Sequence, residues 1–96
     1  MLRLIVLPAA RDDLVEIGDF IAQDNPARAV SFLAEIEARM RDAAARPQSF
    51  PVRDDLHPGL RSARHGRYLI FFLIADGDAR IVRVLHDARN LPGILA

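Results

Sequence analysis

The longest apolar stretch of the chain is also its clearest strand signal. Residues 68 to 75, Tyr-Leu-Ile-Phe-Phe-Leu-Ile-Ala, form a run of eight without a charge. The run is far too short to cross a bilayer, and its Phe and Ile residues favour extended backbone. The pattern therefore predicts a strand that is covered on both faces and lies in the middle of a sheet.

Turn residues on both sides of this strand predict a three-stranded antiparallel meander. Asp76-Gly77-Asp78 follows it and places residues that tolerate positive φ between two apolar runs, which is a hairpin signal. We expect the return strand from Ala79 to Leu85. On the other side, Gly66 is expected to turn a shorter basic strand, Leu60 to His65, into the central one.

The first half of the chain predicts a strand and two helices that cover this sheet. Residues 2–7 are apolar apart from Arg3 and predict a strand. Two stripes at helical spacing follow, beginning at Pro8 and at Asn25-Pro26, and the charged residues of the first segment, Asp13 included, are expected opposite its stripe. The stripes are Ala10, Leu14, Ile17 and Ile21, then Ala29, Leu33, Ile36, Met40 and Ala43.

The connections between these segments define the fold class. The link between the helices is very short, which predicts an αα-hairpin with its apolar side on the sheet. Arg46-Pro47 ends the second helix, and the Pro- and Gly-containing residues 47–59 form an irregular connector. We therefore predict an α+β fold, an N-terminal strand, an αα-hairpin and a meander forming one sheet, in a single domain over residues 1–96.

Composition excludes several kinds of chemistry. The chain has no cysteine, which rules out disulfides, thiolate zinc sites and a cysteine nucleophile. No spacing of His, Asp and Glu indicates a metal site, and we expect no cofactor. The absence of a long apolar segment predicts no membrane span, and we expect a cytoplasmic protein.

The net charge of zero hides an uneven distribution. Residues 1–50 carry six arginines against eight acids, whereas residues 51–96 carry seven against five. All thirteen basic residues are arginine, which suits bidentate recognition of carboxylate or phosphate, although genomic base composition explains the count better. Arg61, Arg64 and Arg67 lie in a stretch from His57 to Tyr68 that contains no acid, so a docking surface for an acidic partner is expected there.

Three stretches in this order resemble the RelE/ParE superfamily of bacterial toxins, the toxin halves of type II toxin–antitoxin pairs. They are residues 10–20 with the Asp13-Leu14 pair, residues 66–72 (Gly-Arg-Tyr-Leu-Ile-Phe-Phe), and residues 83–86 (Arg-Val-Leu-His) followed by Arg89. The resemblance spans nearly the whole chain and is nearer to the ParE branch than to the RelE branch.

The ParE-like resemblance implies a poison that traps DNA gyrase by protein binding and breaks no bond itself. It also implies a cognate ParD-like antitoxin, whose acidic C-terminal segment folds on the toxin surface. No sequence-specific binding of nucleic acid by the toxin alone is expected. The residues expected to contact partners are Arg61, Arg64, Arg67, Arg83 and Arg89.

A RelE-like endoribonuclease that cuts mRNA on the ribosome is the alternative. Such an enzyme needs a base, a cation for the scissile phosphate and an acid for the leaving oxygen. The chain has no lysine, and no tyrosine follows His86, so the base would be His86 or His65 and the clamp Arg83. Arg83 and His86 lie three positions apart and point to opposite faces of a regular strand, so a bulge or an early strand end would be required.

Each candidate also has a structural alternative. Arg83 could pair with Asp54, Asp55 or Asp87 instead of a ligand, and His86 could close the strand by a hydrogen bond to backbone. A third hypothesis is that the whole protein is a binding module of the same fold and is not toxic.

Overall fold

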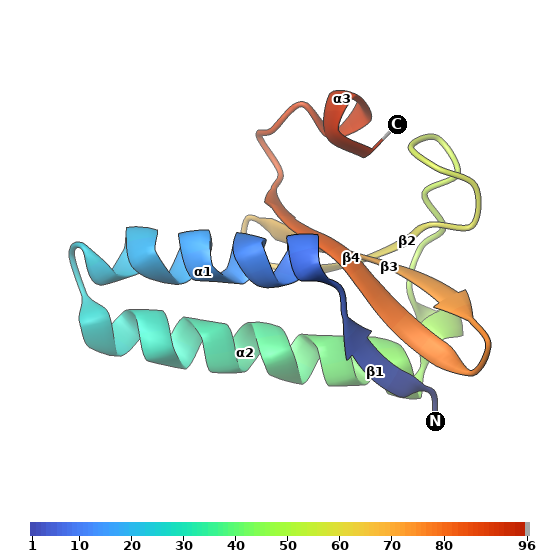
Figure 1. Cartoon of the computed structure of the whole chain (residues 1–96), viewed down its shortest axis with the longest axis horizontal. Coiled ribbons are helices and arrows are strands. Elements are labelled where there is room, and N and C mark those ends of the chain that lie inside the picture. The colour runs from blue at the N-terminus through green and yellow to red at the C-terminus, as the bar shows by residue number, and fades with distance from the viewer. Residues whose placement is uncertain (96) are drawn as a thin grey trace.

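A computed structural model describes residues 1–95, which form one four-stranded sheet and two long helices (Figure 1). The strands are β1 (Arg3–Val6), β2 (Arg61–His65), β3 (Tyr68–Ala75) and β4 (Asp78–His86). The helices are α1 (Pro8–Ala22), α2 (Pro26–Ala45) and the short α3 (Leu91–Leu95), with a 3-10 turn, η1, at Pro47–Ser49. The α+β fold and the αα-hairpin of the prediction are confirmed.

The two long helices begin differently although both have proline in the first turn. Asn25 caps α2 because its side-chain oxygen accepts the N–H of Arg28 at 3.0 Å. Leu7 precedes α1 and offers no side-chain cap. The helices then approach closely at Gly18, where an added Cβ would lie 2.9 Å from Leu33 Cδ1. A side chain at this position would force Leu33 to move.

The sheet order is β1-β4-β3-β2, so β3 is an inner strand as predicted. β2, β3 and β4 form the antiparallel meander, while β1 pairs with β4 in parallel. The predicted bounds of β3 are confirmed, and β4 extends one residue beyond its prediction at each end. The Asp76-Gly77 turn takes φ values of 53° and 78°, as a two-residue hairpin with positive φ requires.

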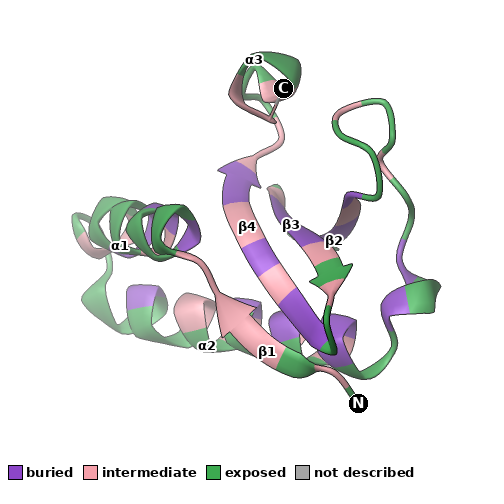
Figure 2. Ribbon diagram, turned by 45° about the vertical axis from the view of Figure 1, so that its right-hand side comes forward, coloured by how far each residue is buried: buried purple, intermediate pink, exposed green. Residues whose placement is uncertain are grey.

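Both faces of the sheet are covered, but by different parts of the chain (Figure 2). The face toward α1 and α2 holds the larger core, which includes Ile36, Met40, Ile70 and Phe72. The opposite face, called here the second face, holds a smaller cluster of Leu60, Leu69, Phe71 and Leu85. Residues from the connector and from α3 pack on this smaller cluster. The sequence did not predict α3, and its position explains how the second face is covered.

Candidate partner-binding surface

Two of the predicted arginines meet one carboxylate at the end of the sheet. Arg64 Nη1 donates to Asp87 Oδ2 at 2.9 Å, and Arg67 Nε lies 3.1 and 3.0 Å from the two Asp87 oxygens. The hydrogen bonds from Arg67 and then from Arg64 hold the pKa of Asp87 at about 2. Both arginine side chains remain largely exposed, at 55% and 71%. One acid between two guanidinium groups leaves a net positive surface here.

Arg61 lies apart from this pair. It is opposite Phe72 in the sheet register, so its side chain emerges on the face of the helices, whereas Arg64 is opposite Leu69 of the second face. Its Nη1 donates to the carbonyl of Phe50 at 2.8 Å. This half-buried contact ties the connector to β2, and the structure does not bring Arg61 into one surface with Arg64 and Arg67.

Arg83 forms a bidentate ion pair with Asp13 of α1. Arg83 Nε and Nη2 donate to the two Asp13 oxygens at 2.8 Å each, and the backbone N–H of Val84 donates to Asp13 Oδ2 at 2.9 Å. The side-chain hydrogen bonds to Asp13 raise the pKa of Arg83, and Asp13 is only 4% exposed. The predicted partners Asp54, Asp55 and Asp87 were wrong. The predicted structural role of Arg83, an ion pair within the chain, is the one that these contacts show.

A signal for this pair was present in the sequence. Asp13 follows Ala10 by three residues and precedes Ile17 by four, so it lies on the apolar face of α1. Its placement on the opposite, polar side in the prediction was therefore wrong. A carboxylate at a buried helical position requires a cationic or N–H partner, and the strands that pack on α1 are where such a partner is found.

His86 ends β4 in a backbone contact. Its Nδ1 accepts the N–H of Ala88 at 3.1 Å, and its ring packs edge-on against Tyr68 with centroids 5.3 Å apart. The irregularity in the β3–β4 register falls before Arg83, where Phe71 is opposite Arg83 and Phe72 opposite Ile81. The strand then runs without interruption through His86, so Arg83 and His86 stay on opposite faces.

A hollow of about 410 Å³ lies between α1 and the end of β4. Tyr68, His86 and Arg89 line one side, and the carboxylates of Glu16 and Asp19 line the other. Within residues 1–95, the Arg89 side chain makes no ion pair. The hollow therefore has an acidic wall on α1 and a basic wall after β4, beside the Arg64–Asp87–Arg67 cluster.

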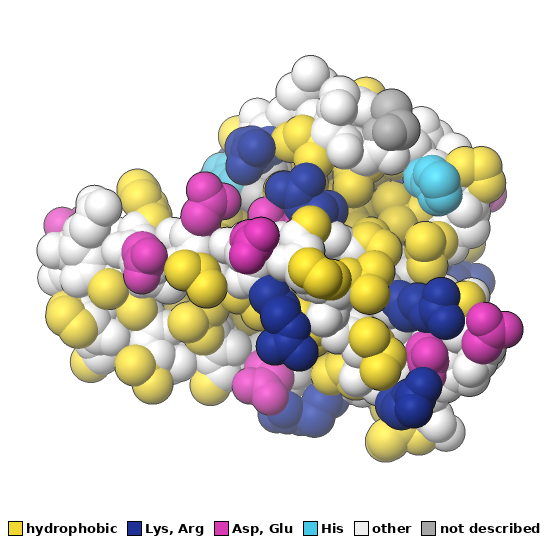
Figure 3. All heavy atoms as spheres, viewed as in Figure 1, with side chains coloured by type: hydrophobic (Ala, Val, Ile, Leu, Met, Phe, Trp, Pro, Cys, Tyr) yellow, Lys and Arg dark blue, Asp and Glu magenta, His cyan; other side chains and the backbone are white. Residues whose placement is uncertain are grey.

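A second hollow, of about 230 Å³, opens on the second face of the sheet. Its lining is mostly apolar and comes from β3, β4, the connector and α3: Leu60, Leu73, Val82, Ile94 and Leu95, with His57 and Arg83 beside them. Figure 3 shows apolar side chains below α3 with basic side chains on either side. Such a surface can accept apolar side chains whose neighbours are acidic.

Two kinds of feature are not found among residues 1–95. No group of three His, Asp or Glu side chains is placed to hold a metal ion. None of the helices described has both the length and the apolar character needed to cross a membrane.

Comparison with known proteins identifies the family of this chain. Residues 4–91 match the model of the ParE toxin of the type II toxin–antitoxin system parDE. The chain belongs to the ParE toxin family. It is 31% identical over 91 residues to Toxin ParE1 of Mycobacterium tuberculosis, and the match covers 93% of each chain. The ParE-like resemblance of the sequence is thereby confirmed.

Solved structures of toxin–antitoxin systems share the fold of this chain. A chain of the chromosomal ParDE toxin–antitoxin system of P. aeruginosa matches with a TM-score of 0.76 over 90% of this chain and 96% of that one, at 19% identity, which supports the fold alone. A chain of the toxin–antitoxin complex RelBE2 of Mycobacterium tuberculosis matches with a TM-score of 0.65 over 88% and 96%, at 28% identity.

Proposed function

We propose that this ParE-family toxin acts in the cytoplasm by binding proteins: it poisons DNA gyrase, and a ParD-like antitoxin neutralises it. The observation that supports this best is the ion pair between Arg83 and Asp13. A guanidinium held by two hydrogen bonds to a buried carboxylate is not free to clamp a scissile phosphate. His86, the candidate base, lies on the opposite face of β4 and already accepts a backbone N–H.

The antitoxin contact follows from the charges on the surface. Arg64 and Arg67 both pair with the single carboxylate of Asp87, and Arg89 lies at the neighbouring hollow. Three guanidinium groups are therefore available to the carboxylates of an acidic segment. Apolar side chains of the same partner would fit the hollow on the second face. A segment that is disordered alone and folds on this surface would stabilise the toxin by mass action.

Expression without antitoxin tests whether the protein is toxic, and two assays then identify the target. The expected results are growth arrest, inhibition of supercoiling by purified gyrase, and intact ribosome-bound mRNA. His86→Ala is expected to retain toxicity, because the imidazole has no chemical role in this proposal. Cleavage of mRNA in the decoding centre that is lost in His86→Ala would overturn it. Normal growth would instead favour a binding module that is not toxic.

One observation favours the endoribonuclease as the second candidate. Tyr68, His86 and Arg89 line the same hollow, so an imidazole and a guanidinium are near each other. Glu16 and Asp19 line it as well and would repel a phosphodiester. We therefore rank this function below gyrase poisoning.

The proposed contact of Arg64 and Arg67 with the antitoxin can be tested by substitution with a matched control. Arg64→Glu/Arg67→Glu should weaken binding of the antitoxin encoded in the adjacent reading frame by at least about tenfold, because like charges would then face each other. Arg41→Glu, an equally exposed position on α2, should leave the affinity unchanged. Equal affinities for the two variants would remove the Arg64–Arg67 pair from the interface.

A further inference from the structure

A third hollow, of about 480 Å³ and called here the arginine hollow, lies where the C-terminal end of α2 and the connector meet β2. Its volume is that of a pocket for a small ligand or for one group of a larger ligand. Four arginines from α2, its C-terminal boundary, the connector and β2 line it: Arg39, Arg46, Arg53 and Arg64. Within residues 1–95, no Asp or Glu side chain joins this lining, so an entering anion would meet positive charge on several sides.

Two of these arginines have carboxylate partners that lie outside the hollow. Arg46 Nη2 is 3.9 Å from Asp42 Oδ1, and Arg53 Nε donates to Asp55 Oδ1 at 3.1 Å. Both acids reach solvent, with side chains that are 46% and 62% exposed. Ion pairs of this exposed kind add little to stability, so the two guanidinium groups remain available to a more highly charged anion.

Backbone hydrogen bonds between the connector and β2 hold the wall of the arginine hollow in place. The Ser62 N–H donates to the Pro51 carbonyl at 3.2 Å, and the Arg53 N–H donates to the Leu60 carbonyl at 2.6 Å. The connector is therefore fixed against the strand before any ligand arrives. A site that is already formed loses less conformational entropy when it binds.

The lining of the hollow suits the phosphates of a nucleic acid better than its bases. Phe50 is the aromatic residue of this lining and is only 8% exposed. The guanidinium of Arg39 lies over its ring, 4.9 Å from the centroid, and Phe72 packs edge-on against it with centroids 6.0 Å apart. Among the described residues of the lining, a base therefore finds no open ring to stack on, in contrast to sites for single strands. Guanidinium groups and the hydroxyls of Ser49 and Ser62 are donors of the kind that proteins direct at phosphate oxygens.

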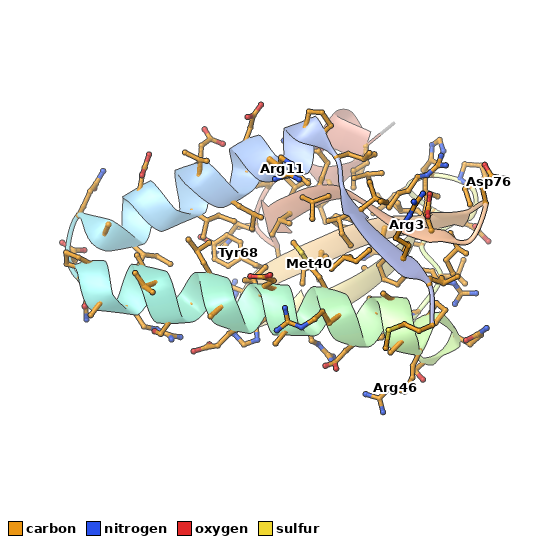
Figure 4. All side chains as sticks on the ribbon, turned by 60° about the horizontal axis from the view of Figure 1, so that its bottom comes forward. Arg3, Arg11, Met40, Arg46, Tyr68 and Asp76 are labelled. Atoms are coloured by element: carbon orange, nitrogen blue, oxygen red, sulfur yellow. The ribbon has the colours of Figure 1, made fainter. Side chains whose placement is uncertain are left out.

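Duplex DNA suits this set of donors better than a single strand does. Its bases are stacked inside, so a protein that meets the outside of the duplex meets a dense row of phosphate charges. Contacts to phosphates alone carry no sequence information, which agrees with the expectation that this toxin alone reads no sequence. Figure 4 shows Arg46 projecting outward at the C-terminal end of α2, and its side chain is 68% exposed, so it can reach a phosphate at the rim of the hollow.

We propose that the arginine hollow binds backbone phosphates of duplex DNA without reading its sequence. Arg39, which donates its Nε to the carbonyl of Arg64 at 3.1 Å, is a fixed part of the wall, while Arg46 extends from the rim toward the DNA backbone. The role of this contact rests on the proposed function, because a toxin bound to gyrase lies beside the DNA that the enzyme holds. The phosphate contact then adds to the affinity of the toxin for gyrase only when DNA is present.

Binding of a fluorescently labelled DNA duplex of mixed sequence at low salt tests the site directly. Arg46→Glu should bind the duplex at least about fivefold more weakly than Arg41→Glu, and its slope of log affinity against log salt should be shallower by about 1. The control is closely matched, because Arg41 is 60% exposed on the same helix and, like Arg46, pairs with an acid four positions earlier. Both substitutions also change the net charge equally. Equal affinities of the two variants, or a wild-type toxin that does not bind the duplex, would overturn the proposal.

Other ligands are distinguished in the same assay. A second duplex of unrelated sequence should bind with the same affinity as the first. Tighter binding of a single strand or of an RNA duplex would overturn the assignment to duplex DNA. Unchanged DNA binding by Arg46→Glu together with weakened binding of the antitoxin would assign the hollow to an acidic protein segment instead.

A measurement with purified gyrase separates this inference from the proposed function. Duplex DNA should raise the affinity of the wild-type toxin and of Arg41→Glu for gyrase by about tenfold, whereas Arg46→Glu should lose most of this gain and bind gyrase alone as the wild type does. Inhibition of gyrase with the same gain in both variants would overturn the phosphate site and leave the proposed function intact. A toxin that binds DNA through Arg46 but neither binds nor inhibits gyrase would overturn the proposed function and leave the phosphate site.

Discussion

At the scale of single residues, Asp13 joins α1 to β4 where β1 no longer covers that strand. β1 ends opposite Ile81, and beyond it the edge of β4 faces α1. The Asp13 carboxylate accepts the Val84 N–H and both donors of Arg83, so it fills the role that a neighbouring strand would have. One buried acid thereby satisfies a backbone donor and neutralises an arginine in the sheet.

Removing the charge of Asp13 should lower stability substantially. Asp13→Asn is expected to cost about 3 kcal/mol of unfolding free energy, because it leaves a partly buried guanidinium without its counter-ion. Asp12→Asn, on the exposed side of the same helix, should change stability by about 0.5 kcal/mol or less. Urea unfolding with a common m-value measures both. Equal midpoints for the two variants would contradict the role assigned to Asp13.

The Asp87 cluster predicts a pH dependence with a definite sign. The pKa of Asp87 is about 2 in the folded protein, below its usual value of 3.8, because Arg67 and Arg64 hydrogen-bond the ionised form. A depressed pKa contributes stability above the unfolded value, and the contribution is lost as the pH falls from about 4 toward 2. The stability difference between wild type and Asp87→Asn should therefore be present at pH 6 and shrink toward pH 2. A stability difference between the two proteins that does not change with pH would contradict this prediction.

At the scale of elements, the β3–β4 hairpin depends on its turn. Asp76 and Gly77 both have positive φ, and aspartate tolerates this conformation better than most residues with a side chain. No atom lies within 4 Å of a Cβ added at Gly77, so substitution there tests backbone conformation alone.

Gly77→Ala should cost about 1 kcal/mol, because a Cβ is unfavourable at positive φ. Gly77→Asn should cost less, since asparagine visits the left-handed region more readily. Thermal or urea unfolding of the two variants against wild type gives the comparison. An alanine variant as stable as the asparagine variant would show that the turn relaxes to another conformation.

Local signals in the sequence were sufficient for the helices, the meander and the hairpin turn. Proline at helix starts, the Asp-Gly turn and the spacing of apolar residues each act within a few positions. The pairing of β1, the placement of α3 and the identity of the partners of Asp13 and Asp87 were not available in this way. Each depends on residues that meet only after folding, such as Asp13 and Arg83, which are 70 positions apart.

The same distinction applies to the candidate site. The sequence identified arginines without local acids, but it could not say which face of β2 each occupies. The register separates Arg61 from Arg64, and the fold brings Asp87 to Arg64 and Arg67. Arg89 had no distinguishing local signal beyond the resemblance, and its position beside the hollow at α1 emerged only from the structure.

At the scale of the whole molecule, the two faces of the sheet differ in how deeply the helical residues that cover them are buried. The helix face is closed by side chains that are almost fully buried, such as Ile36 at 0% and Met40 at 1% exposure. On the second face, Leu91, Ile94 and Leu95 of α3 are only partly buried where they pack on the smaller cluster. A protein that binds partners through its surface benefits from this difference, because the weaker side can adapt while the helix side keeps the fold.

Two truncations of the same residue type test this asymmetry. Ile36→Ala should cost about 3 kcal/mol, because it leaves a cavity in close-packed surroundings. Ile94→Ala should cost about 1 kcal/mol or less, because the side chain is only partly buried and the five-residue α3 can shift toward the sheet. Val15→Ala, 61% exposed on α1, serves as the control and should be near neutral. If Ile94→Ala cost as much as Ile36→Ala, the second face would be a full part of the core, and a partner could enter its hollow only by displacing tightly packed side chains.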